Sequence, residues 1–547
     1  MLIRLLHSRH DRHLIILTLT LMSLLLGACR REQQTAGTPL PTIATPAAVS
    51  AATTAPATQT PAPAPSPTEA ATATATSTAT ATSSPTPRPA TVAVPDGWVA
   101  DVNAVLPPTG RRWEITSAVD PAAELAAGRA HIALVTGENG IPVAQEPFVL
   151  AVPFTTEWEA VTLSQAQEIV NNGHTLVTVL PWRRLTPSLK PLRVDGVHPL
   201  APDYPLQQSW SLAAAPGYEE AAEELANLLP STPPAAQTVH LAAVGDVMLD
   251  RALGAAIRNG NVDYPFANVA GLLQSADVAA ANLESALGDV GEPAAKSYTF
   301  RAPPAAASSL ARAGFDVVTL ANNHALDYGP AALSQGMALL QEQGIATVGA
   351  GQNAQAARTP ALLTVKGISL AFLGYVHVPV EGSPPYFDTQ SWAATETTPG
   401  LAWADPEQIQ ADVAAARQQA DHVVVFLHSG YEYVPAPSEP QTTAARAAIA
   451  AGASLVIGHH AHILQGVEFH ESGVIAYGLG NFAFTIDGRP ETAILNVWLD
   501  RDGVRQIEFV PALVGNDGQP HLAQGEEAAA IRRNVYFLTD LLNASGR

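Results

Sequence analysis

The stretch GASLVIGHHAHILQ (452–465) places three histidines directly after an apolar run. Leu455, Val456 and Ile457 have the character of a buried strand, and His459, His460 and His462 follow at its end. In an extended strand His460 and His462 would point the same way and His459 the opposite way, whereas on a turn residues i and i+2 can hold two adjacent ions. The stretch alone leaves three readings open: a metal site, a catalytic base, or histidines on a loop.

The same pattern recurs through residues 236–547, where apolar runs end in polar or catalytic-type residues and alternate with helical stretches. The expected strands are TVHLAAVGDV, DVAAANLE, DVVTLANNH, SLAFLGYV, HVVVFLHSG, SLVIGHH and VIAYGLGNF, and the expected helices include PAAASSLARAG and PEQIQADVAAARQQA. Apolar strands of this length between helices predict an α/β fold with a sheet covered on its faces. In such sheets functional groups collect where the strands end.

One strand end after another carries a side chain that binds metal ions or transfers protons. The residues are Asp246, Asn282, Glu284, Asn322, Asn323, His324, His428, Glu432, His460, His462 and Asn481. Each is weak alone, because a single histidine at a strand end is more often a hydrogen-bonded structural residue. Their convergence on one edge favours a divalent cation such as Mn, Zn, Fe or Co. A carboxylate that bridges two ions would make a two-metal site.

The motifs GDVMLDR, NLES, NNH, HSGYEY, GHHAH and GLGNF, in this order, resemble the CapA family of capsule and poly-γ-glutamate synthesis proteins. The resemblance covers essentially all of 236–547 and implies the fold of the related calcineurin-like metallophosphoesterases. That fold is a four-layer α/β/β/α sandwich with a dinuclear metal centre at the strand ends.

The resemblance also implies roles for single residues. Six would bind one or two divalent ions (Mn, Zn or Fe): Asp246, Glu284 as the bridging carboxylate, Asn323, His428, His460 and His462. His324 would be a general acid or stabilise the transition state, and Glu432 and Asn481 would orient water or substrate. His459 would pack or donate a hydrogen bond without binding metal.

Three positions depart from the family pattern, and one of them, Ala461 in place of a proline between His460 and His462, removes no ligand. Met248 stands where the metallophosphoesterases have a histidine ligand, and a thioether binds hard divalent ions poorly, so one metal site is expected to be weak or empty. Ser429 stands where the family has a tryptophan, which removes an aromatic wall from the expected substrate site.

The N-terminus has the layout of a secretory signal. Arg4, Arg9 and Arg12 precede an apolar run that is short for a membrane-spanning helix, and LGAC ends at Cys29, the only cysteine of the chain. LGAC resembles a bacterial lipobox, so residues 1–29 are expected to be a lipoprotein signal peptide, with Cys29 lipidated and the rest of the chain outside the cytoplasmic membrane. The alternative is an uncleaved anchor with an incidental cysteine.

Two further segments precede the 236–547 domain. Residues 30–95 are rich in Thr, Ala, Pro and Ser, which predicts a disordered stalk or a plain linker. Residues 96–235 predict a small α/β domain, with strands at 131–137 and 147–154 and a helix at 164–173. This segment resembles type 2 periplasmic solute-binding proteins of the phosphate-binding kind. No residue set in it identifies a ligand, and a domain that binds nothing small is the plainer reading.

Charge limits the partners. The chain of 547 residues has a net charge of −21, which argues against nucleic acid. The resemblance implies poly-γ-glutamate or a related anionic polymer as partner, together with the membrane and a polymer synthase or export complex. Three functions stay open: a metal-dependent hydrolase or transferase acting on γ-glutamyl amides, a non-catalytic polymer-binding assembly factor, and a secreted metallophosphoesterase acting on phosphoesters.

Overall fold

The computed structural model describes residues 89–107, 112–229, 234–485 and 488–545. The predicted signal peptide, Cys29 and most of the predicted 30–95 stalk lie outside these residues. Within them, no helix combines the length and the apolar character that crossing a membrane requires. The domain boundaries predicted above stay predictions.

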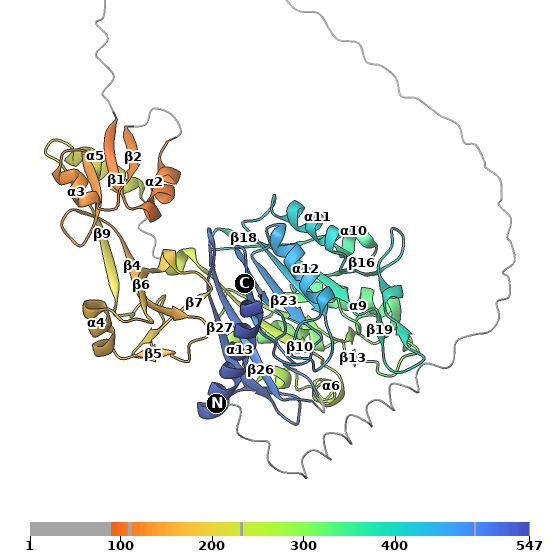
Figure 1. Cartoon of the computed structure of the whole chain (residues 1–547). Coiled ribbons are helices and arrows are strands. Elements are labelled where there is room, and N and C mark those ends of the chain that lie inside the picture. The colour runs from red at the N-terminus through yellow and green to blue at the C-terminus, as the bar shows by residue number, and fades with distance from the viewer. Residues whose placement is uncertain (1–88, 108–111, 230–233, 486–487, 546–547) are drawn as a thin grey trace, which may run out of the picture. The chain divides into compact units, whose positions relative to one another are not determined.

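Seven strands form the first sheet of the C-terminal region, in the order β15-β14-β11-β10-β26-β27-β28. Figure 1 labels β10, β26 and β27 of this sheet. Strands β10, β11, β14 and β15 run parallel, and β26 pairs antiparallel with β10. The bounds are β10 Val239–Val247, β11 Val278–Leu283, β14 Val317–Thr319, β15 Ala346–Val348, β26 Glu491–Asp500, β27 Gly503–Val514 and β28 Pro520–Leu522.

Six strands form a second sheet in the order β17-β18-β22-β23-β25-β24, of which β18, β22, β23 and β25 are parallel. The bounds are β17 Ala361–Val365, β18 Ile368–His377, β22 His422–Ser429, β23 Leu455–His459, β24 Val467–His470 and β25 Gly473–Ala476. Every apolar run predicted as a strand in this region is therefore confirmed as one.

The alternation of side chains along the strands builds four layers. On β10, Leu241 and Ala243 face a core shared with Phe372 and Phe426 of the second sheet, so the two sheets pack face to face. The next residues on β10, Ala242 and Val244, face the opposite way into a core with helices. The outer face of the second sheet packs on helices in the same manner. This is the four-layer α/β/β/α sandwich that the resemblance implies.

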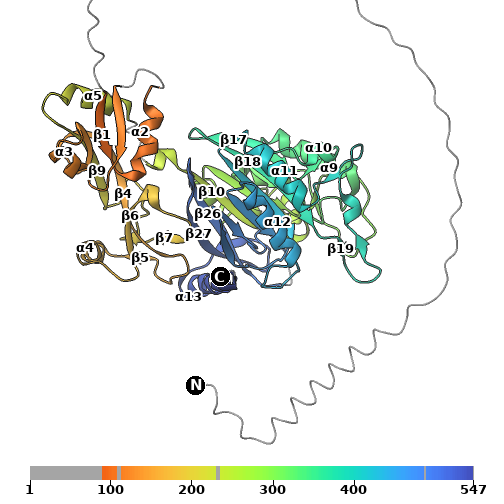
Figure 2. The ribbon, with the colours of Figure 1, turned by 45° about the horizontal axis from the view of Figure 1, so that its top comes forward.

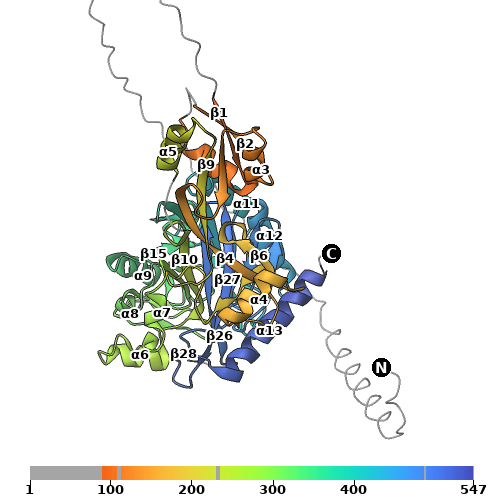
Figure 3. The same ribbon diagram turned by 90° about the vertical axis from the view of Figure 1, so that its left-hand side faces the viewer.

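The covering helices come from the connections between parallel strands. Figure 3 shows α6 to α9 on one side of the strands and α11 and α12 on the other. Their bounds are α6 Arg251–Arg258, α7 Ala270–Leu273, α8 Ala306–Ala313, α9 Gly329–Glu342, α11 Pro406–Ala416 and α12 Glu439–Ala450. Ser438 and Gln441 form a reciprocal capping box that fixes the start of α12, directly after the loop that carries Glu432. The C-terminal helix α13 (Gly525–Ser545) packs on β24 and β27.

Residues 90–229 form a separate sheet in the order β2-β1-β3-β9-β4-β6, with β7 paired to β4 (Figure 2). Strand β4 contributes to two apolar clusters, one around Trp98 and Trp113 and one around Leu150 and Tyr204. The bounds are β1 Ala90–Val94, β2 Trp113–Ser117, β3 Ile132–Thr136, β4 Ile141–Pro153, β6 Thr178–Pro181, β7 Leu189–Pro191, β9 Gln207–Ala214, α2 Val99–Val105, α3 Pro121–Ala126, α4 Leu163–Asn172 and α5 Glu219–Leu228. The predicted strands at 131–137 and 147–154 and the helix at 164–173 correspond to β3, β4 and α4.

Candidate metal centre

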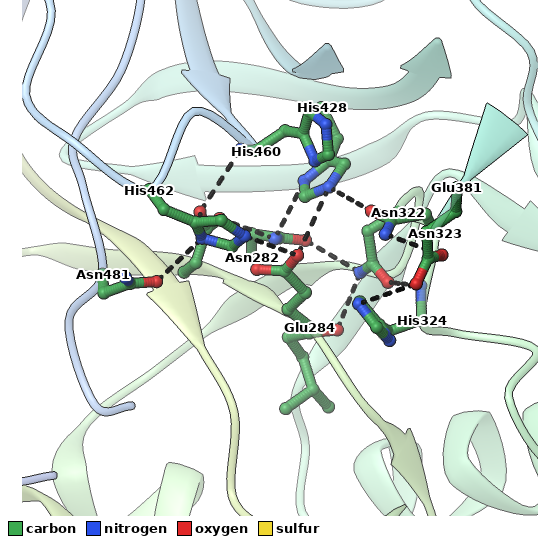
Figure 4. A network of polar contacts seen from close by, with 12 residues as sticks. Asn282, Glu284, Asn322, Asn323, His324, Glu381, His428, His460, His462 and Asn481 are labelled. Carbon is green, nitrogen blue, oxygen red and sulfur yellow. Dashed lines mark hydrogen bonds and ion pairs between the residues drawn. The ribbon is translucent and has the colours of Figure 1, made fainter. Parts of the chain in front are cut away.

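The two packed sheets bring their strand ends to one place, and the predicted ligands meet there (Figure 4). Asp246 ends β10, Glu284 follows β11, and Asn323 and His324 follow β14 in the first sheet. From the second sheet, His428 lies near the end of β22, and His460 and His462 follow β23. The structure buries all seven side chains: Asp246, Glu284, Asn323, His324, His428, His460 and His462.

Two glycines allow the backbones at this edge to approach closely. A Cβ on Gly245 would lie 1.9 Å from the Gly480 carbonyl oxygen, and a Cβ on Gly458 would lie 1.9 Å from the Tyr477 carbonyl oxygen. Directly after β23, His460 and His462 adopt left-handed backbone conformations with φ of 81° and 54°. Such conformations in non-glycine residues cost energy and occur chiefly where the surrounding structure requires them. Of the strand and the turn considered for these two histidines, the turn is therefore the one present, and it directs both side chains into the site.

The close approach at Gly458 leads to a stability prediction. Gly458→Ala is expected to lower the free energy of unfolding by about 3 kcal/mol or more, because the new methyl group meets backbone that cannot move aside cheaply. Gly271→Ala is the matched control, since a Cβ there meets nothing within 4 Å. Denaturant unfolding of the two variants measures the difference. Equal stabilities would contradict the structure at this strand end.

The site contains two groups of three side chains whose ligand atoms lie within 4.8 Å of one another and which share Glu284. One group is Asp246, Glu284 and His462, and the other is Glu284, His428 and His460. Neither carboxylate oxygen of Glu284 accepts a hydrogen bond from the described residues, and His460 Nδ1 also has no partner among them. Buried polar atoms without partners are uncommon in folded proteins. Shared carboxylate oxygens and imidazole nitrogens suit a pair of borderline divalent cations, so the residues present fit a dinuclear centre.

Amide side chains hold the ligands in place. Asn282 Nδ2 donates to Asp246 Oδ1 at 2.8 Å, and Asn322 Nδ2 donates to Asn282 Oδ1 at 2.9 Å. Asn323 Oδ1 lies 2.8 Å from His428 Nε2, at the edge of the second group. Asn481 Oδ1 lies 2.9 Å from His462 Nδ1. Asn481, predicted to orient water or substrate, is thus placed against a predicted ligand, where it fixes the orientation of the imidazole ring.

The histidines of the site differ in the direction in which their surroundings shift the pKa. Burial lowers the pKa of His428 well below its usual value, with a further contribution from His460, and burial together with His462 lowers the pKa of His460 to about 3. These two imidazoles are therefore neutral, as metal ligands must be. Burial acts in the same direction on His462, but the charge of Glu284 and the contact with Asp246 outweigh it and raise the pKa of His462 to about 10.

The two carboxylates differ as well. Burial and the neighbouring charge of Asp246 raise the pKa of Glu284 well above its usual value. Burial also acts to raise the pKa of Asp246, but the hydrogen bond with His462 and the nearby His459 lower it overall. Two acidic groups this close and this deeply buried are costly together, and a divalent cation between them offsets that cost.

Met248 packs in an apolar cluster that borders the site, because its partners Phe300 and Phe484 contact the rings of His324 and His462. Its side chain is fully buried in a small apolar cluster with Phe300 and Phe484, and its sulfur accepts a hydrogen bond from the Asp250 backbone at 3.3 Å. The thioether is thus engaged with the backbone of the following turn. The group of Asp246, Glu284 and His462 keeps three ligands without it.

Glu432 and His459 take different places at the edge of the site. Glu432 is solvent-exposed and forms a third group with His460 and His462 within 4.8 Å, so its carboxylate reaches the ligands from the solvent side. His459 is buried, and its Nε2 lies 3.3 Å from the Val244 carbonyl oxygen. The placement of His459 agrees with the packing role expected for it.

Three residues that the sequence did not single out surround His324. Asp327 Oδ2 lies 2.8 Å from His324 Nδ1, and Lys296 Nζ lies 2.7 Å from Asp327 Oδ1 and 2.6 Å from Glu381 Oε2. The lysine side chain is 1% exposed, so this is a buried ion network. Asp327 holds Nδ1 of His324 and leaves Nε2 as the nitrogen that faces Glu381 Oε1, 3.9 Å away. Asp327 follows His324 by three residues, which is a readable signal, whereas nothing in the sequence marked Lys296 or Glu381.

Comparisons with known proteins found relatives of this chain. Residues 240–486 match the family model described as "Bacterial capsule synthesis protein PGA_cap". The chain is 30% identical over 287 residues to "Capsule biosynthesis protein CapA" of Bacillus anthracis, which covers 51% of this chain and 67% of that protein. It is 31% identical over 274 residues to "PGA biosynthesis protein CapA" of Bacillus subtilis (strain 168), covering 49% and 70%. The solved structure of TT1561 of Thermus thermophilus overlaps 50% of this chain and 98% of that one, with 14% identity and a TM-score of 0.28, and we draw no conclusion from similarity at that level.

Proposed function

Because the chain belongs to the CapA family of bacterial capsule synthesis proteins, we propose that it processes poly-γ-glutamate as a metal-dependent hydrolase or transferase. The observation that carries the proposal is Glu284. Its two buried oxygens have no hydrogen-bond partner among the described residues, and they are shared by two groups of ligand side chains. His428 Nε2 and His462 Nε2 lie 3.5 and 3.8 Å from Glu284 Oε1 without a hydrogen bond, whereas a purely structural carboxylate buried this deeply would be hydrogen-bonded.

We further propose that the protein is lipid-anchored outside the cytoplasmic membrane through Cys29. The support is the basic, apolar and LGAC order of the N-terminus. A polymer synthase or export complex at the same membrane would be the natural partner. Membrane fractionation of a Cys29→Ser variant checks the anchor, since release of the protein is expected and its retention would contradict the proposal.

The residues divide the proposed chemistry among them. Asp246, Glu284, His428, His460 and His462 would hold the ions, with the amide oxygen of Asn323 beside them. A divalent ion there supplies a Lewis acid and activates water near neutral pH. For a γ-glutamyl amide, the water oxygen adds to the carbonyl carbon and the C–N bond breaks. The leaving nitrogen takes a proton from Nε2 of His324, and Glu432 at the exposed edge accepts the proton that water gives up. In the transfer reaction an acceptor amine replaces water.

The decisive experiment measures polymer length. Purified full-length protein is incubated with γ-linked and α-linked glutamate polymers, with added Mn or Zn and with a chelator. Shortening of the γ-linked polymer alone, lost on chelation and in His324→Ala, is the expected result. Loss of the general acid is expected to slow the reaction by about 100-fold or more.

Other outcomes point to the alternative functions. Binding of the γ-linked polymer with no change in its length, unaffected by chelation, would refute the enzyme and support a polymer-binding assembly factor. Hydrolysis of an aryl phosphate that is lost in His428→Ala, with the polymer left intact, would indicate a phosphoesterase.

A further inference from the structure

A pocket lies in the N-terminal α/β region, at the carboxyl ends of the parallel strands β1 and β2. Its volume is 310 Å³, and its lining includes Asp96, Trp98, Glu146, Arg183, Arg184 and Trp210. Pockets at the carboxyl ends of parallel strands are common ligand sites, and this volume suits a molecule the size of an amino acid or a dipeptide.

The inner wall of this pocket is fixed by contacts among its own residues. Glu146 is 1% exposed, and Arg183 Nε and Trp210 Nε1 donate to its two oxygens at 2.6 and 2.9 Å. The Arg183 guanidinium lies 3.6 Å from the centre of the Trp98 ring, and Trp98 meets Trp210 edge to face. The charge of Glu146 is therefore compensated inside the wall. The aromatic rings and the guanidinium are held in place before any ligand arrives.

Two hydrogen-bond donors at the pocket remain unused. Trp98 is 4% exposed, yet its indole Nε1 has no acceptor among the described residues. Arg184 is exposed and lies against Gly97, where a Cβ would come within 3.0 Å of Arg184 Nε. Among the described residues, no hydrogen bond or ion pair involves the Arg184 guanidinium. An indole N–H and a guanidinium both require acceptor oxygens.

The remaining charge sets the kind of ligand. Asp96 is exposed at the pocket and, like Arg184, has no charged partner among the described residues. With Glu146 and Arg183 already paired, the open charges are one positive and one negative. A dianion such as phosphate would meet two carboxylates and one free guanidinium, which is unfavourable. A molecule that carries a carboxylate beside an amine matches both charges.

We propose that this pocket binds a small amino-carboxylate, with the carboxylate held by Arg184 and Trp98 Nε1 and the nitrogen held by Asp96. If the chain processes poly-γ-glutamate as proposed above, the ligand is free glutamate or the terminal residue of a γ-glutamyl chain, which present the same groups. The role of the N-terminal region would then be to sense or hold the building block or the polymer end. The metal-centre domain would act on the polymer.

Calorimetric titration of the full-length protein tests the proposal with L-glutamate, a γ-glutamyl dipeptide and inorganic phosphate as probes. Binding of at least one amino-carboxylate is expected, and phosphate is expected to bind more weakly. Arg184→Gln is expected to raise the Kd about tenfold or more, since a hydrogen bond to a charged group is lost. Trp98→Phe keeps the ring and removes the N–H, so a rise of about threefold or more is expected. Arg129→Gln, which removes an exposed arginine of the same region, is the control and should leave the Kd unchanged.

Three outcomes would overturn the inference: no binding of either amino-carboxylate, phosphate binding as tight as theirs, or equal Kd values for wild type and Arg184→Gln. Preference for the dipeptide would identify the polymer end, and preference for glutamate the free amino acid, and both support the site. Metal content is measured on the same samples and should not change in Arg184→Gln. Failure of this pocket and failure of the proposed enzyme activity are therefore distinguishable.

Discussion

Glu284→Gln is expected to abolish binding of divalent metal at both positions of the centre. Glu284 is the one residue common to both of its buried three-residue groups, and an uncharged amide at that position neither bridges two ions nor balances their charge. Changes in residues that only orient a ligand already cost 10–100-fold in metal affinity, so loss of the bridge should cost on the order of a hundredfold or more. Elemental analysis of protein loaded with Mn or Zn should find metal content falling from two ions per chain to none.

Variants that change only one of the two ligand groups serve as the comparison for Glu284→Gln. Asp246→Asn and His428→Ala each touch one of the two groups, so each should retain one ion. Glu468→Gln is the matched control, because Glu468 is also a buried glutamate but is paired with Arg446 and Tyr477 outside the centre. Its metal content should equal that of the wild type. Two ions in Glu284→Gln would refute the bridging role, and so would loss of both ions in Asp246→Asn with Glu284 intact.

Lys296→Met is expected to lower the free energy of unfolding by about 3–5 kcal/mol, which is the usual cost of leaving a buried charge without its partner. The lysine ammonium pairs with two carboxylates at once, Asp327 and Glu381, and these are 0% and 10% exposed. Without the ammonium, the two carboxylates must take up a proton or bind water, and both are unfavourable in a buried site. A cost of this size is a large share of the stability of an ordinary domain, and denaturant unfolding measures it.

The control for Lys296→Met is a lysine in a more exposed pair. Lys366 pairs with Asp277, with side chains 33% and 22% exposed, so Lys366→Met should cost about 1 kcal/mol or less. A loss at Lys296 no larger than the loss at Lys366 would contradict the buried network. Because the Lys296 ammonium also donates to the Asn323 carbonyl oxygen at 2.6 Å, metal content should be measured in the same variant.

The strand ends were predictable because buried parallel strands have a recognisable composition. Runs such as those around Val425 and Val456 are buried on both faces, so they are apolar throughout and stop abruptly at a polar residue. Once several such runs share a sheet, their final residues must meet. That reasoning located Asp246, Glu284, His428 and His460 in one place from the sequence, whereas the four-layer arrangement came only with the family resemblance.

The residues around His324 were not predictable in this way. Glu381 belongs to the two-residue strand β19 (Val380–Glu381), which pairs with β20 (Phe387–Asp388) in a loop beyond β18, and Lys296 lies in a segment without regular structure. Neither position has a periodic pattern, and only tertiary folding brings them to His324. The N-terminal pocket was missed for the same reason. Trp98, Glu146 and Arg183 come from three segments that the sequence keeps far apart.

The division of the ligands between two sheets has a mechanical consequence. Asp246 and Glu284 come from one sheet, and His428, His460 and His462 from the other. Each bound ion would therefore cross-link the two sheets of the sandwich. Anything that binds the folded state alone stabilises it in proportion to the logarithm of its concentration. For a protein proposed to work outside the cell, the free energy of unfolding would then depend on the metal concentration around it. At low metal concentration, the strand ends of the two sheets would separate from each other first.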